Sequence, residues 1–138
     1  MADKSETDSH RVSMIETLNS LRHNEKFCDV YILVEDTKFP AHKNVLCASS
    51  DYFNSMFTSD FQESKKDEIE LEGKSKIFEE LLEFAYTGEM SADIPIPDAI
   101  DMLSMAAYLQ VNWGVGATRF WYDDKALDLH LLGKSLQN

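Results

Sequence analysis

The stretch that most restricts the fold is the apolar run FCDVYILVE at residues 27–35. Every position from Val30 to Val34 is apolar, so both faces of an extended segment there would need cover. Such a run is typical of a strand in the centre of a sheet, because neighbouring layers must bury both faces. After a two-residue turn, TKFPAH at 37–42 is predicted to return as the hairpin partner, closed by Pro40.

Helical patterns and one more strand fill the rest of the first 111 residues. EIELE at 68–72 alternates, with two apolar side chains inward and three glutamates outward, which predicts a strand with one solvated face. In the last predicted helix, the inner face is expected to carry Ile100, Leu103 and Ala107. Together these elements predict a small α+β fold, a sheet of at least three strands capped by helices. The predicted helices cover residues 11–23, 43–49, 50–59, 75–88 and 97–111.

Composition narrows the class of protein. The chain has 138 residues, 43% of them hydrophobic, which suits one domain with a real core. A net charge of −12 argues against a nucleic-acid partner, because phosphate binding needs clustered Lys and Arg. No apolar run approaches the roughly 18 residues of a membrane helix, and the charged N-terminus does not resemble a secretory signal. Cys28 and Cys47 lie in apolar segments, as reduced core residues of a cytoplasmic or nuclear protein do.

Motifs for catalysis or cofactors are missing from the sequence. It contains no phosphate loop, dinucleotide fingerprint or zinc spacing, so we expect no cofactor, no metal site and no enzyme activity. A nucleophile pair of Cys47 and His42 is conceivable, but Cys47 lies on a predicted helix that should bury it. Asp29 interrupts the central strand and must be paired there, either with Lys43 as a buried charged pair or by accepting backbone N–H groups.

The predicted N-terminal helix is apolar over an unusually wide arc. Met14, Leu18 and Leu21 form one stripe, and Ile15 lies beside it. A helix with so wide an arc is covered on more than one side, either by a partner chain or by deep docking in its own domain. Residues 1–10 are polar and expected to be mobile.

Several motifs in the right order resemble the BTB/POZ domain family: FCDV, FPAHKNVL, SDYFNSMF, EIELEG and FAYTGEM. The resemblance covers roughly residues 11–111 and leaves 112–138 as an atypical C-terminal tail, in which DKALDLHLL at 124–132 predicts a short docked helix. It implies a domain-swapped homodimer formed through the N-terminal helix, which would give the stripe its second cover. It also implies a module that assembles other proteins, either as an adaptor for a cullin-3 ubiquitin ligase or as a dimerisation and corepressor-docking domain of a transcriptional regulator.

The resemblance also assigns roles to residues in the polar segment TSDFQESKK. Cullin-recruiting BTB domains resemble one another in a hydrophobic-x-Glu signature, and Phe61 and Glu63 stand at that place. The alternative is that Phe61 packs back onto Phe57. Tyr86 resembles a position that faces the same partner, whereas a corepressor groove would involve the region of Asp29 and Lys43. The BACK and propeller domains, MATH domain or zinc fingers of larger family members are not in this sequence, so we expect a shortened product or a stand-alone module, with its substrate unassigned.

Overall fold

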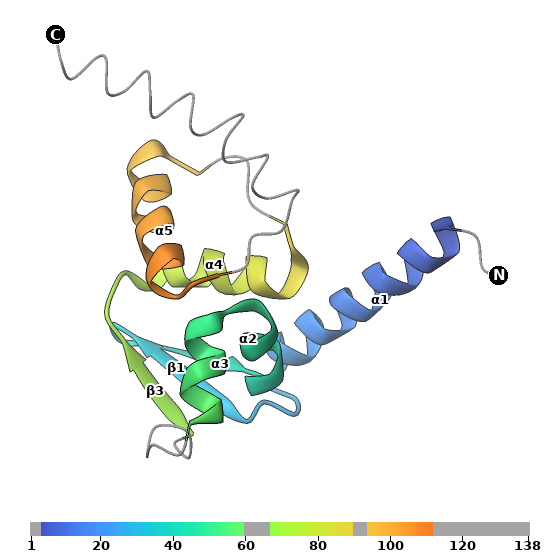
Figure 1. Ribbon diagram of the computed structural model, residues 1–138, viewed down its shortest axis with the longest axis horizontal. Helices are drawn as coiled ribbons and strands as arrows, with labels where there is room; N and C mark the ends of the chain where they lie inside the picture. The colour runs from blue at the N-terminus through green and yellow to red at the C-terminus, as the bar shows by residue number, and fades with distance from the viewer. Residues whose placement is uncertain (1–3, 60–66, 90–93, 112–138) are drawn as a thin grey trace, which may run out of the picture.

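The computed structural model describes residues 4–59, 67–89 and 94–111, and Figure 1 shows their arrangement. Within these ranges a three-stranded sheet is capped by helices, which confirms the predicted α+β class. The strands are β1 (Val30–Val34), β2 (Thr37–Ala41) and β3 (Glu68–Leu71). The helices are α1 (Lys4–His23), α2 (Lys43–Ser49), α3 (Asp51–Thr58), α4 (Ser75–Thr87) and α5 (Ile96–Tyr108).

Strand β1 is central, as its apolar run predicts. The sheet order is β2-β1-β3, with β2 antiparallel and β3 parallel to β1. The strand begins at Val30 rather than at Phe27, whose φ of +61° places it outside any ladder. Pro40 lies within edge strand β2 instead of ending it. It stands opposite Tyr31, whose N–H donates to Asp67 on the other side, so no ladder hydrogen bond is lost.

The core lies between the sheet and the central helix α4. The carboxylate of Glu35, in the β1–β2 turn, accepts a hydrogen bond from the Ser75 N–H at 2.7 Å and so satisfies the start of α4. Ser75 is thus the first helical residue, and Lys74 is the N-cap. Gly88 ends the helix with φ +74°, a left-handed conformation that glycine adopts without strain. The buried residues of α4 are Ile77, Phe78, Leu81, Leu82, Phe84 and Tyr86.

Helix α5 packs on α4 through a face that the sequence did not predict. Its buried residues are Ala99, Met102, Met105 and Ala106, whereas Ile100 is 43% exposed and Ala107 is also exposed. The helix carries apolar residues on both arcs, so its pattern alone does not say which arc meets α4. The expected inner face is therefore wrong for these two residues, and Leu103 is half-buried.

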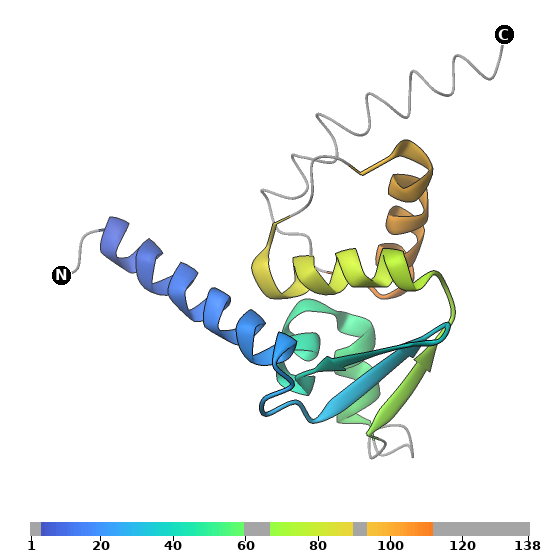
Figure 2. The same cartoon turned by 180° about the vertical axis from the view of Figure 1, so that it is seen from behind.

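Helix α1 projects from the body of the molecule in both views (Figures 1 and 2). It has 20 residues and begins at Lys4, so most of the segment expected to be mobile is helical. Helix α1 contacts α4 and β2 through its C-terminal end, where Arg22 is buried. Over the described ranges, no helix combines the length and apolar composition that crossing a bilayer requires.

Candidate protein-interaction surfaces

A polar network anchors the C-terminal end of α1 to α4. The buried Arg22 guanidinium forms an ion pair with Glu83, donates two hydrogen bonds to Asn19 Oδ1, and lies 4.9 Å from the Tyr86 ring centroid. Burial raises the pKa of Glu83, but the hydrogen bond from Asn19 and the charges of Arg22 and His23 outweigh it and lower the pKa overall. This network fixes the direction in which α1 leaves the domain.

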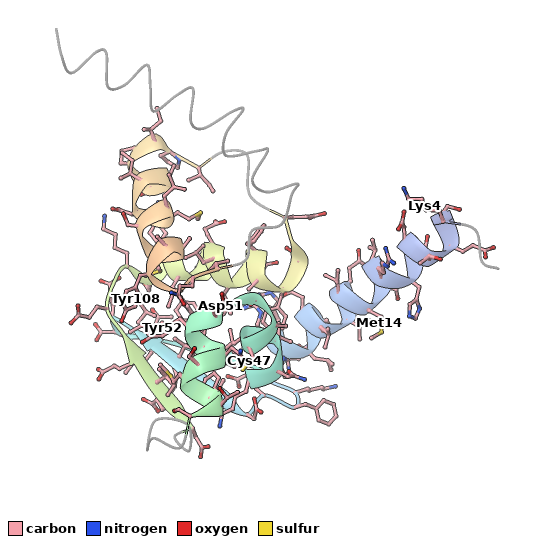
Figure 3. The ribbon with its side chains drawn as sticks, in the orientation of Figure 1. Lys4, Met14, Cys47, Asp51, Tyr52 and Tyr108 are labelled. Atoms are coloured by element: carbon pink, nitrogen blue, oxygen red, sulfur yellow. The ribbon has the colours of Figure 1, made fainter. Side chains whose placement is uncertain are left out.

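The projecting part of α1 leaves its apolar side chains uncovered. Met14 is 53% exposed and lies well out along the helix in Figure 3. Ile15 and Leu18 are half-buried and line an open groove of about 520 Å³ with Val45 of α2 and residues at the end of α4. Leu21 is half-buried near the anchor. Deep docking in its own domain is therefore not what covers this arc.

Tyr86 is a core residue, not a surface contact as the resemblance implied. Its side chain is 4% exposed, and its hydroxyl accepts a hydrogen bond from the His42 N–H at 2.8 Å. The His42 Nε2 lies 2.9 Å from the Lys26 carbonyl oxygen, which can only accept, so Nε2 carries the hydrogen and Nδ1 accepts from Tyr86 at 2.7 Å. Burial raises the pKa of Tyr86 to about 12, against the opposing effects of that N–H and of Arg22. Tyr86 thus ties α4 to the start of α2.

Of the two alternatives for Asp29, the structure shows acceptance of a backbone N–H, and the buried charged pair with Lys43 is wrong. Asp29 precedes β1, where it is exposed, and its Oδ1 accepts a hydrogen bond from the Lys43 backbone N–H at 2.7 Å. A short carboxylate can satisfy a free N–H at the start of a helix without being buried, so no ion pair is needed. The ammonium of Lys43 instead lies 5.4 Å from the Phe57 ring centroid.

The two thiols are free, and the structure separates Cys47 from His42. The Cys47 Sγ contacts the Phe53 carbonyl oxygen at 3.9 Å, while the thiol near His42 is that of Cys28, at 3.7 Å from Nε2. Burial raises the pKa of both thiols, which disfavours the nucleophilic thiolate. The conceivable Cys47 nucleophile pair is therefore not formed.

An aromatic pair that sequence reasoning missed lies where α3 meets α5 (Figure 3). Tyr52 and Tyr108 have ring centroids 5.1 Å apart and hydroxyl oxygens 3.4 Å apart, and Tyr108 is 59% exposed. Burial and the hydrogen bond to Tyr108 raise the pKa of Tyr52 to about 12. A weak signal was present, because Tyr108 follows directly on the buried residues of a helix. Its partner is 56 residues away, which no local pattern reveals.

Backbone contacts hold the two helices of this pair in place. The Ser50 hydroxyl caps α3 by accepting from the Phe53 N–H at 3.2 Å, and it donates to the Leu109 carbonyl oxygen at the end of α5. The Asp51 N–H donates to the Gln110 carbonyl oxygen at 3.2 Å. These bonds join the start of α3 to the end of α5, so the two tyrosines share one rigid surface, which we call the α3–α5 surface.

The predicted cullin contacts Phe61 and Glu63 lie outside the described residues. Tyr52 lies in the first turn of α3, whereas Phe61 and Glu63 follow the last residue of that helix, Thr58, along the chain. Phe57, the proposed internal partner of Phe61, is half-buried and stacks on Phe53 with a centroid distance of 5.8 Å. The tail at 112–138, with its predicted helix, also lies outside the described part of the chain.

Known proteins similar to this chain fit the fold just described. Kelch-like protein 36 of Rattus norvegicus is 37% identical over 107 residues, which are 77% of this chain and 17% of that protein. Human Kelch-like protein 7 is 44% identical over 77 residues, 55% of this chain and 13% of that protein. Among solved structures, the BTB domain of zebrafish PATZ1 matches with a TM-score of 0.67 at 32% identity, covering 80% of this chain and 86% of that one.

The chain thus spans less than a fifth of the length of these Kelch-like relatives. The family of the chain itself follows from a match to a family model. The family model of the BTB/POZ domain matches residues 18–114, which include β1 to β3 and α2 to α5. The confirmed α+β class agrees with that match. The chain belongs to the BTB/POZ domain family of protein-interaction modules.

Proposed function

We propose that this chain is the BTB module of a cullin-3 adaptor, which binds the cullin through the α3–α5 surface and the segment that follows α3. The observation that carries the proposal is the partly exposed aromatic pair of Tyr52 and Tyr108, which hydrogen bonds of Ser50 and Asp51 hold where the start of α3 meets the end of α5. Rigid, partly exposed tyrosines are frequent anchors of protein interfaces. Phe61 and Glu63 follow α3 in the chain and would extend the same contact. The Kelch-like relatives support this choice among BTB functions.

The test is a calorimetric titration of the cullin-3 N-terminal domain into the full chain. Phe61→Ala is expected to weaken binding roughly 30- to 1,000-fold, the loss of an anchoring aromatic, and Glu63→Ala less. Tyr108→Ala is expected to weaken it by about tenfold or more. Tyr31→Ala, at a half-buried position on the outer face of the sheet, is the matched control and should bind as wild type.

Two results would contradict this proposal in different ways. Unchanged binding in Phe61→Ala and Tyr108→Ala would remove the cullin contact from this surface. A fall of many degrees in the melting temperature of Phe61→Ala would show that Phe61 is packed in the core, as the alternative with Phe57 requires.

We further propose that a second copy of the chain covers α1. The support is the uncovered apolar arc, in which Val12 and Met14 are each more than half exposed. Stable dimer interfaces commonly bury more than about 2,000 Å², so one carboxylate within the arc should disrupt the assembly. Met14→Asp is expected to give monomers in light scattering, whereas Ser13→Asp, at an exposed polar position outside the apolar arc of the same helix, should remain dimeric. A dimeric Met14→Asp protein would show that the interface lies elsewhere.

A second candidate function is corepressor docking by a transcriptional regulator. The groove of about 520 Å³ between α1, α2 and α4 favours it, because apolar side chains line an open path beside the proposed dimer interface. The same titration separates the two functions. An intact dimer that gives no heat with the cullin-3 domain would favour the corepressor function.

A further inference from the structure

Tyr108 also lines a second open groove, which lies between the end of β3, the start of α4 and helix α5. Its volume is about 470 Å³, and Gly73, Ile77, Met105 and Tyr108 contribute to its lining. Gly73 has φ +133°, and a Cβ at this position would overlap the Met105 methyl group. The floor is therefore a glycine packed against a thioether side chain, which adapts readily to apolar groups of different shape. Tyr108 forms a wall whose ring is more than half exposed.

The charges around this groove are unbalanced. Lys74, which lines the groove, is held by Asp101 at 2.7 Å, and Lys76, in the first turn of α4, is held by Asp98 at 2.8 Å. Each described lysine near the groove already has an acidic partner. Glu72, at the groove, is a further exposed carboxylate and forms no ion pair with any described residue. The groove thus combines an apolar floor with surplus negative charge at its edge.

We propose that this groove binds a short segment of a partner protein in which an apolar side chain is flanked by arginine. The apolar side chain packs on Met105 and Ile77. The guanidinium is complementary to Glu72, because arginine matches a carboxylate in two parallel hydrogen bonds, and it can also stack on the exposed ring of Tyr108. An acidic segment would be repelled, and a segment without an apolar side chain would leave the floor empty. Because Tyr108 also belongs to the α3–α5 surface, the segment and a cullin bound there would compete, whereas the groove floor and Glu72 do not depend on the proposed cullin contact.

The test uses the full chain with labelled methionine methyl groups and glycine amides, followed by NMR. The probe is the peptide acetyl-Gly-Arg-Leu-Arg-Gly-amide, and the comparison peptides carry Glu in place of Arg or Gly in place of Leu. We expect the Met105 methyl and Gly73 amide signals to shift saturably with the probe alone. Glu72→Lys should weaken binding about tenfold, since it replaces attraction by repulsion at the contact. Glu16→Lys makes the same change in net charge on α1 and should leave affinity within about twofold.

Three outcomes would overturn the proposal. Equal binding of the peptide without leucine would show diffuse electrostatic attraction. Equal weakening by Glu72→Lys and Glu16→Lys would show that only net charge matters. The third outcome is a Met105 methyl signal that does not respond to the peptide in the full chain but does respond to it after deletion of residues 112–138. This result would show that the chain's own tail occupies the groove. Glu72 is exposed, so both charge variants should retain the wild-type spectrum away from the substitution.

Discussion

Replacing Arg22 should destabilise the domain more than its place near the end of a projecting helix suggests. The side chain is 5% exposed, and its guanidinium contacts Glu83, Asn19 and the ring of Tyr86. Removing one partner of a fully buried ion pair costs about 3–5 kcal/mol, whereas an exposed pair contributes about 0–1 kcal/mol. The Glu83 side chain is 42% exposed, so water can solvate its carboxylate once Arg22 is gone. The cost of losing Arg22 is therefore lower than the cost of breaking a fully buried ion pair.

The lost cation–π contact with Tyr86 adds about 1 kcal/mol to this cost. We therefore expect Arg22→Ala to lower the free energy of unfolding by about 2–3 kcal/mol. Arg11→Ala is the matched control in the same helix. Arg11 lies 3.6 Å from Asp8 in a pair whose side chains are 71% and 52% exposed, so its loss should cost no more than about 0.5 kcal/mol.

Urea unfolding of both variants at one protein concentration measures the two costs, since a dimer's stability depends on concentration. Arg22→Met adds a further comparison, because it keeps an apolar stem but not the charge. A cost of Arg22→Ala no larger than that of Arg11→Ala would refute the anchoring role of the network. Equal stability of Arg22→Met and wild type would show that the stem, and not the guanidinium, supplies the stabilisation.

Three further predictions concern ionisation and backbone conformation. The pKa of Glu83 is lowered in the folded protein, so its contribution is present above the unfolded value of about 4.3 and is lost as pH falls through the folded value. Wild type should therefore lose more stability between about pH 6 and about pH 3 than Glu83→Gln, and equal losses in urea titrations would contradict this. Tyr52 and Tyr86 should ionise near pH 12 in ultraviolet titration, and because both pKa values are raised, their stabilising contribution is present below about pH 10 and is lost as pH rises through the folded values. A single tyrosine transition near pH 10 in the folded protein would be the opposite result. Gly73→Ala should cost about 1–3 kcal/mol, since φ +133° is strained for alanine and the new Cβ meets a methionine side chain. Gly88→Ala, at φ +74° with open space around it, should cost about 1 kcal/mol in the same thermal unfolding measurements, and a ranking reversed between the two would contradict the close packing at Gly73.

The elements of this fold could be predicted from the sequence because each leaves a local pattern. The continuous apolar run from Val30 to Val34 required a central strand, and the alternation in EIELE required a strand with one wet face. Ser50 and Gly88 mark helix ends by chemistry that acts within a few residues, a capping hydroxyl and a left-handed backbone. The order of the motifs along the chain was likewise enough to indicate the BTB/POZ family, which the family match at residues 18–114 confirms.

Which face of an element is buried, and what its polar groups contact, was decided only by the tertiary structure. Tyr86 was predicted at the surface, yet it is buried because the start of α2, 44 residues away, supplies a partner for its hydroxyl. For Asp29 the sequence left a buried ion pair and a backbone N–H partner open, and the structure satisfies its carboxylate at the surface with the N–H of Lys43. The pair of Tyr52 and Tyr108 exists because the Ser50 hydroxyl and the Asp51 N–H bind carbonyl oxygens at the end of α5 and so join α3 to α5. Local periodicity records spacing along one element, whereas these outcomes depend on which elements meet, and that information lies in contacts between residues distant in the chain.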